Sequence, residues 1–144
     1  MAKPLRAQCL IAIQKLSRIE AANSNGYAEC VSCDPNALGR WHHWKDMDGG
    51  HFIPKGSSSY WALDRVNVHP QCKGCNGFGM KHGSSEAWYT IWMQNYYGKD
   101  FVEQMLREKG NTKKLYAADY REILAEFNEL TRFHEKRIGQ CWVA

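Results

Sequence analysis

The sequence holds two short cysteine pairs, and these constrain its fold more than any other feature. Residues 30–33 read C-V-S-C and residues 72–75 read C-K-G-C. Each C-x-x-C pair places two thiols one tight turn apart, and two such pairs supply the four thiolates of a tetrahedral zinc site. Because four thiolates leave no open position for water or substrate, we expect the Zn²⁺ to be structural. Its expected ligands are Cys30, Cys33, Cys72 and Cys75.

The alternative to zinc is a set of reduced or redox-active thiols. A thioredoxin-like C-x-x-C needs a βαβ setting, which the surrounding sequence does not provide. The N-terminus lacks the apolar core of a signal peptide, so the export that favours disulfides is not expected. The two remaining cysteines, Cys9 on an apolar helix face and Cys141 near the end, are expected to be neither ligands nor bridges.

We expect a single α+β domain with three parts. Residues 1–26 form an N-terminal helix, residues 27–83 form a zinc-braced finger, and residues 84–144 form C-terminal helices. The middle part carries four of the six cysteines and five of the six histidines, and its helical periodicity is poor. Such a segment is expected to consist of loops and short strands that a metal ion holds together.

The flanking helices follow from apolar spacing. Apolar residues from Leu5 to Ile19 recur at steps of three and four, and a second helix is expected to be capped by Ser84 or Ser85. A longer apolar stripe runs from Tyr116 to Ile138. This stripe either packs on the N-terminal helix or forms a dimer interface, and the sequence does not separate the two.

The charge of the chain permits a polyanionic partner without requiring one. Lysine and arginine number 19 against 15 aspartate and glutamate residues, a net charge of +4. Residues 99–137 hold nine basic and eight acidic side chains, which is typical of a solvated helix surface. No apolar run reaches about 18 residues, so no membrane-spanning helix is expected.

Histidine and asparagine residues surround the cysteine pairs in a recognisable order. G-H-F-I-P contains His51, and N-V-H-P-Q-C-K-G-C-N begins at Asn67 and ends at Asn76. The order C-x-x-C, G-H-F-I-P, N-x-x-x-x-C-x-x-C-N resembles the HNH, or His-Me finger, nucleases. The fuller strings are similar to those of the phage NinG (Rap) recombination endonucleases. The resemblance is close over residues 30–83 and weaker to about residue 130.

The resemblance implies a ββα finger around a catalytic divalent cation, Mg²⁺ or Mn²⁺. A neutral His51 is the candidate base, because an imidazole near pH 7 can take a proton from water. Asn67 is expected to accept a hydrogen bond from the His51 ring and so fix its tautomer. Asn76 corresponds to the last H/N position of the family and is a candidate metal ligand.

One position departs from the family pattern. Many HNH enzymes carry an Asp or His metal ligand directly before the base, where this chain has Gly50. Asp48 shares a strand face with that position, so it is our candidate ligand from one pleat further away. The alternatives are that the two glycines form a bulge that redirects Asp48, or that Asp48 is a turn residue.

The expected partner is DNA, recognised by its shape rather than by its sequence. Trp41 and Trp44 are expected to pack, and Tyr60 and Trp61 either pack or stack on unpaired bases. Ordinary solvation is the alternative for each basic side chain. The candidate DNA contacts are Lys55, Arg65, His69, Lys73, Lys81 and His82.

The resemblance implies a structure-selective endonuclease that acts on Holliday junctions and D-loops. Symmetric junction cleavage needs two active sites, so a homodimer is expected. A phage protein of this kind would act in the cytoplasm of its bacterial host, with no membrane partner. The alternatives are a nicking or nonspecific HNH endonuclease, a non-catalytic zinc-containing DNA-binding module and a zinc-stabilised protein-interaction domain.

Overall fold

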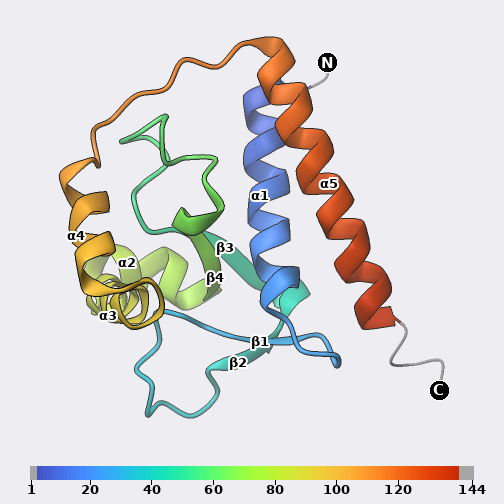
Figure 1. Cartoon of the computed structure of the whole chain (residues 1–144). Coiled ribbons are helices and arrows are strands. Elements are labelled where there is room, and N and C mark those ends of the chain that lie inside the picture. The colour runs from blue at the N-terminus through green and yellow to red at the C-terminus, as the bar shows by residue number, and fades with distance from the viewer. Residues whose placement is uncertain (1–2, 140–144) are drawn as a thin grey trace.

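The computed structural model describes residues 3–139, and it places two small antiparallel sheets among five α-helices (Figure 1). The expected α+β class is therefore confirmed. The helices are α1 (Leu5–Ala21), α2 (Met80–His82), α3 (Ser85–Tyr97), α4 (Lys99–Arg107) and α5 (Ala117–Gly139). The strands are β1 (Tyr27–Glu29), β2 (Trp41–His43), β3 (Met47–His51) and β4 (Val68–Cys72). None of the described helices combines the length and apolar character needed to cross a membrane.

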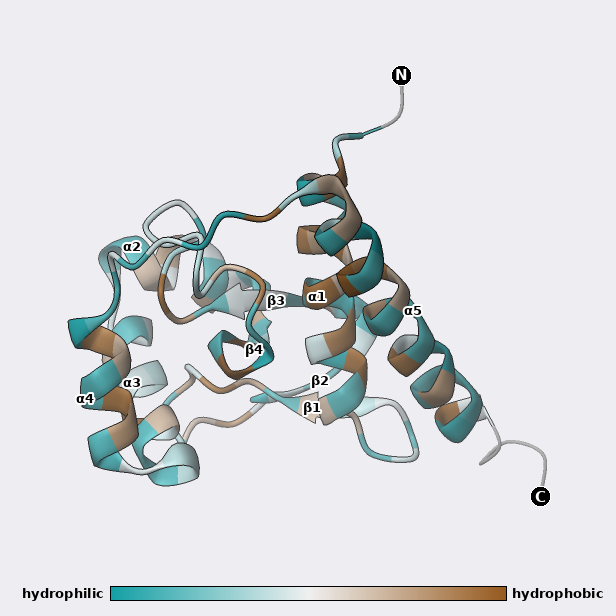
Figure 2. Ribbon diagram, turned by 45° about the horizontal axis from the view of Figure 1, so that its top comes forward, coloured by the Kyte–Doolittle hydropathy of each residue, from teal (hydrophilic) through white to brown (hydrophobic). Residues whose placement is uncertain are grey.

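Helices α1 and α5 lie side by side and run in the same direction (Figure 1). Both alternate hydrophobic and hydrophilic residues along their length (Figure 2), and Ile13 of α1 and Phe127 of α5 are buried in one core. The Arg137 side chain of α5 donates hydrogen bonds to the carbonyl oxygens of Ile19 and Ala22, at 3.2 and 3.0 Å. The apolar stripe of α5 thus packs on α1, the first of its two predicted roles.

The β3–β4 hairpin lies between α1 and the helices α2 to α4 (Figure 1). One face packs on α1, where Met47 and Val68 are buried. A Cβ atom at Gly49 would overlap the backbone of Gln14, so glycine at this position permits the close approach of α1 to β3. Pairing runs without interruption from Met47 opposite Cys72 to His51 opposite Val68. The structure therefore has no bulge at the two glycines.

A second core forms where the loop after β3 meets α3 and α4. Phe52, Trp61 and Tyr89 are buried there, and the Tyr89 hydroxyl donates to the carbonyl oxygen of Gly50 at 2.7 Å. Gly98, with φ of +96°, separates α3 from α4. This core holds the other face of the hairpin, so the hairpin is fixed from both sides.

Candidate functional site

The four cysteine sulfurs form one cluster. All four Sγ atoms lie within 4.8 Å of one another, and Cys33 Sγ lies 3.8 Å from Cys72 Sγ and 3.6 Å from Cys75 Sγ. A tetrahedral Zn²⁺ with bonds of about 2.3 Å requires sulfurs about 3.8 Å apart. The cluster fits zinc, and the predicted pairing of the two C-x-x-C segments is confirmed.

Both hairpins contribute to this cluster. Cys30 directly follows β1, Cys72 ends β4, and the Cys72 backbone N–H donates to Cys30 Sγ at 3.2 Å. Burial is the main cause that raises the pKa of Cys33, and the neighbouring Cys30 thiol raises it further. Burial also raises the pKa of Cys72, to about 11. Burial also acts to raise the pKa of Cys75, but hydrogen bonds from Ser85 and the neighbouring cysteines outweigh it and leave that pKa below its ordinary value. The Cys33 and Cys72 thiols resist ionisation unless a cation replaces their protons, which is what a bound metal ion does.

His51 ends β3, and a backbone carbonyl holds its ring. Within residues 3–139 the ring makes one hydrogen bond, from Nε2 to the carbonyl oxygen of Ala62 at 2.8 Å. A carbonyl oxygen only accepts, so Nε2 carries the proton and Nδ1 of the neutral ring is a free acceptor. Burial lowers the pKa of His51, and the positive charges of Lys55 and Arg6 lower it further, against the opposing effect of the Ala62 bond. The ring is therefore neutral near pH 7.

Asn67 does not bind His51, and this predicted contact is wrong. Asn67 is completely buried. Its Oδ1 accepts from the Ile53 N–H at 2.7 Å, and its Nδ2 donates to the carbonyl oxygens of Ile53 and Trp61 at 2.9 and 3.1 Å. These bonds fix the loop after β3 at two points, Ile53 and Trp61, and Trp61 directly precedes Ala62. The Asn67 side chain thus acts on His51 indirectly, by binding backbone groups of the loop whose Ala62 carbonyl contacts the ring.

Asp48 and Asn76 lie within hydrogen-bonding distance, and the Asn76 amide donates to the Asp48 carboxylate. Asn76 Nδ2 lies 3.1 Å from Asp48 Oδ2, and Lys73 Nζ lies 2.9 Å from Asp48 Oδ1. Burial raises the pKa of Asp48, but the bonds from Lys73 and Asn76 outweigh it and leave the pKa below its ordinary value. One carboxylate and one amide suit an Mg²⁺ that keeps several waters and a substrate phosphate.

The structure explains why residue 50 is glycine. The buried Gln71 side chain fills the space that a Cβ at Gly50 would need, and its amide donates to the Ser32 hydroxyl at 2.7 Å. An Asp or His at residue 50 would displace Gln71 from beside the cysteine cluster. Asp48 is thus the acidic side chain available on this face of β3.

The regular pleat separates His51 from the Asp48–Asn76 pair. Residues three apart on a strand point to opposite faces, and about 10 Å of strand lies between their Cα atoms. The predicted site residues thus form two separate groups, one near each end of β3. Among the described residues, the cysteine cluster is the one set of three or more His, Cys, Asp or Glu side chains close enough to share an ion.

The predicted DNA contacts differ in their surroundings. Lys55 is exposed beside His51, and its carbonyl oxygen accepts from Arg6 at 3.2 Å. Lys81 and His82 are exposed on α2. Arg65 forms an ion pair with Glu20 of α1, and Lys73 is bound to Asp48, so both of these side chains already have acidic partners.

His69 lies among aromatic rings. Its Nε2 lies 2.8 Å from the Val66 carbonyl oxygen and 3.2 Å from the Tyr97 hydroxyl, and its ring centre lies 4.6 Å from that of Trp92. Burial lowers its pKa to about 4. Near pH 7 the neutral ring therefore offers no positive charge to a phosphate, and its contact with DNA stays a prediction.

Three residues near these sites were missed or misjudged. Arg6 and Arg18 reach β3 only because α1 crosses it, and Arg18 donates to the Met47 carbonyl oxygen at 2.9 Å. No local sequence signal marks either arginine.

Trp41, expected to pack, is 54% exposed, whereas Trp44 is buried as expected. The alternation of residues 41–44 would have suggested that these two tryptophans differ in environment.

These features define an α+β protein whose central hairpin has a cysteine cluster of zinc-site geometry at one end and a neutral, oriented histidine at the other. A family model described as Bacteriophage Lambda NinG protein matches residues 6–137. The chain belongs to the NinG family. No curated protein and no solved structure matches the chain.

Proposed function

We propose that this chain is a metal-dependent endonuclease that hydrolyses phosphodiesters in branched recombination intermediates such as Holliday junctions and D-loops. Membership of the NinG family and the HNH-like order of His51, Asn67 and Asn76 support this proposal. One observation carries it. The bond from His51 Nε2 to Ala62 leaves Nδ1 as a free acceptor on a neutral ring, the state that a general base requires.

The proposed reaction begins with a water molecule that donates a hydrogen bond to His51 Nδ1. The imidazole takes the proton as the water oxygen attacks phosphorus, and the bond that Nε2 donates to the Ala62 carbonyl oxygen stabilises the imidazolium that forms. Arg6 and Lys55, whose positive charges act on this ring, neutralise charge on the phosphate. Asn67 keeps the loop, and with it the Ala62 carbonyl, in place during the step.

Asp48 and Asn76 are the proposed ligands of the catalytic cation. When bound, Mg²⁺ or Mn²⁺ would neutralise developing negative charge and assist the departing 3′ oxygen. Lys73 now occupies part of this position, and an arriving cation would have to displace its ammonium from Asp48. Asp48 would remain ionised throughout, because its pKa is lowered.

The test is a His51→Ala variant assayed on a four-way DNA junction with Mg²⁺ or Mn²⁺. We expect junction binding to persist and cleavage to fall by about 100-fold or more, as for loss of a general base. His134→Ala, on α5 and remote from this site, is the matched control and should cleave normally. Cleavage by His51→Ala at the wild-type rate would overturn the mechanism.

A non-catalytic zinc-containing DNA-binding module is the second candidate. It is favoured by the ion pair that already neutralises Asp48 and by the span of β3 that separates Asp48 from His51. Such a module would bind junctions with either residue replaced and would cut none of them. Wild-type cleavage that depends on His51 would exclude it.

A further inference from the structure

A pocket of about 350 Å³ lies where α1, β4, α3 and the β1–β2 hairpin meet. Its volume falls within the range of about 300–1000 Å³ that is usual for small-molecule sites. The pocket is hereafter the aromatic groove. Its aromatic lining residues are Trp41, His69, Trp92, Tyr96 and Tyr97.

Flat aromatic surface is unusually accessible in this groove. Trp41 is 54% exposed and Tyr96 is 68% exposed. Tyr96 stacks on Trp92 with ring centres 5.0 Å apart and ring planes at 10°, so the two rings form a stacked pair that a further flat ring could extend. Exposed aromatic rings interact weakly with water and stack favourably on another planar ring.

The acidic residues of the groove carry little net charge. Glu20 and Glu29 line it, and each forms an ion pair with an arginine, Arg65 and Arg40 respectively. Their carboxylates therefore offer hydrogen-bond acceptors without attracting a cation strongly. A neutral, planar ligand with amino groups suits this combination, and a nucleobase has these properties because the amino group of cytosine donates to carboxylates.

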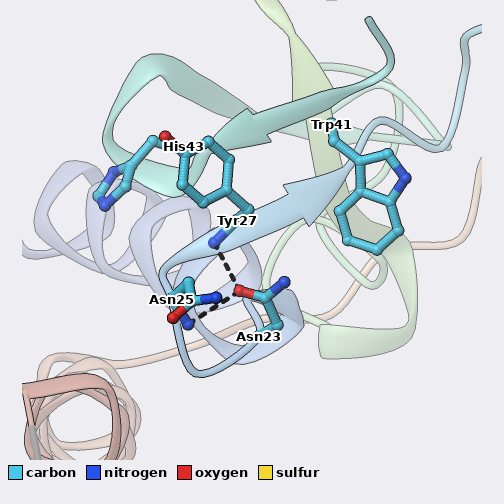
Figure 3. A pocket seen from close by; sticks show the side chains of 5 residues that line it. All are labelled: Asn23, Asn25, Tyr27, Trp41 and His43. Atoms are coloured by element: carbon cyan, nitrogen blue, oxygen red, sulfur yellow. Dashed lines mark hydrogen bonds between the residues drawn. The ribbon is translucent and has the colours of Figure 1, made fainter. Parts of the chain in front are cut away.

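A second, more open hollow of about 630 Å³ adjoins Trp41 (Figure 3). Trp41 lies there beside Tyr27 and His43, which share its face of the hairpin because paired positions and alternate residues point the same way. The loop below is ordered, since Asn23 Oδ1 accepts from the backbone N–H groups of Asn25 and Tyr27 at 3.0 Å each. The exposed ring surface thus continues beyond the groove.

We propose that the aromatic groove receives one unpaired nucleobase of a DNA substrate, stacked on Trp41 or on the Trp92–Tyr96 pair. The proposal rests on the proposed action on branched DNA, since branch points expose unpaired bases. Neighbouring nucleotides would lie over Tyr27 and His43, in the adjoining hollow. Selectivity for branched DNA would then reside in a surface away from His51.

The test uses duplex DNA with one unpaired 2-aminopurine, whose fluorescence reports stacking. Because loss of a stacking ring weakens binding by roughly fivefold or more, we expect Trp41→Ala and Tyr96→Ala to bind this bulge at least that much more weakly. Both residues are exposed, so both variants should fold. Phe133→Ala, an equally exposed aromatic on α5, is the matched control and should bind normally.

A second duplex carries an abasic residue at the bulge and removes only the base. Wild type and Trp41→Ala should bind it equally. Binding of the 2-aminopurine bulge by both Trp41→Ala and Tyr96→Ala as tightly as by wild type, with junction cleavage intact, would overturn the groove proposal alone. Absence of all DNA binding by the wild type would overturn the proposed function as well.

Discussion

The His51 ring depends on a backbone carbonyl, and its chemistry follows from that one bond. The Ala62 oxygen fixes the proton on Nε2, and burial keeps the ring neutral. Asn67 contributes indirectly, because its Nδ2 donates to the carbonyl oxygen of Trp61, the residue before Ala62. A buried asparagine that satisfies three backbone groups is costly to replace, since each unpaired group costs about 1–3 kcal/mol.

The pH dependence of cleavage follows from the lowered pKa of His51. Only the unprotonated ring accepts a proton, so the rate should fall as pH drops through the His51 pKa and level off above it. The midpoint should lie below the ordinary value of 6.5, because burial disfavours the charged ring. A single-turnover pH profile measures this midpoint, and one above 6.5 would contradict the assignment.

Asp48 should control the requirement for the divalent cation. Asp48→Asn removes the carboxylate charge, and we expect the Mg²⁺ concentration for half-maximal cleavage to rise about tenfold or more. Asp46→Asn, an exposed neighbour outside β3, is the matched control. A titration of junction cleavage against Mg²⁺ makes the comparison, and identical curves for Asp48→Asn and wild type would remove Asp48 from the site.

At the scale of elements, the cysteine cluster joins the two hairpins. β1 supplies the approach to Cys30, β4 delivers Cys72, and the Val31 N–H donates to the Pro70 carbonyl oxygen at 3.0 Å. The strands are only three to five residues long, and two-stranded hairpins are marginal alone. A metal ion held by the cysteine cluster at their junction would account for a fold with so little regular structure between residues 27 and 72.

Zinc removal should therefore loosen the middle of the chain. We expect wild type to contain one Zn²⁺ per chain, and Cys33→Ser to lose it and melt at a lower temperature, since structural zinc contributes about 10 kcal/mol or more. Elemental analysis and thermal melting measure both effects. Cys9→Ala, which alters a buried cysteine outside the cluster, should keep its zinc. Full zinc content in Cys33→Ser would contradict this assignment.

Local sequence signals predicted the elements that depend on nearby residues. The apolar spacing gave α1, Ser84 precedes α3 as expected, and the predicted short strands of the middle part include β4. The C-x-x-C spacing gave the metal cluster because each pair is a local turn. The His51–Ala62 bond was not predictable, because it depends on the path of an aperiodic loop between β3 and β4.

Across the whole molecule, α1 unites the structure. It packs on α5 along one side and crosses β3 on another, and it brings Arg6 and Arg18 to the two ends of that strand. Since α1 covers the apolar stripe of α5, the expected homodimer would need a different surface. Helix α3, which carries Trp92, Tyr96 and Tyr97 of the aromatic groove, lies on the opposite side of the molecule from α5 (Figure 1).

The central claim is that this chain cuts branched DNA with a divalent cation. The most direct measurement incubates the purified wild-type protein with a labelled four-way junction, with EDTA, Mg²⁺ or Mn²⁺ present, beside His51→Ala prepared in the same way. We predict cleavage only by wild type with added Mg²⁺ or Mn²⁺. A wild-type protein that binds the junction but cuts it under none of these conditions would contradict the account.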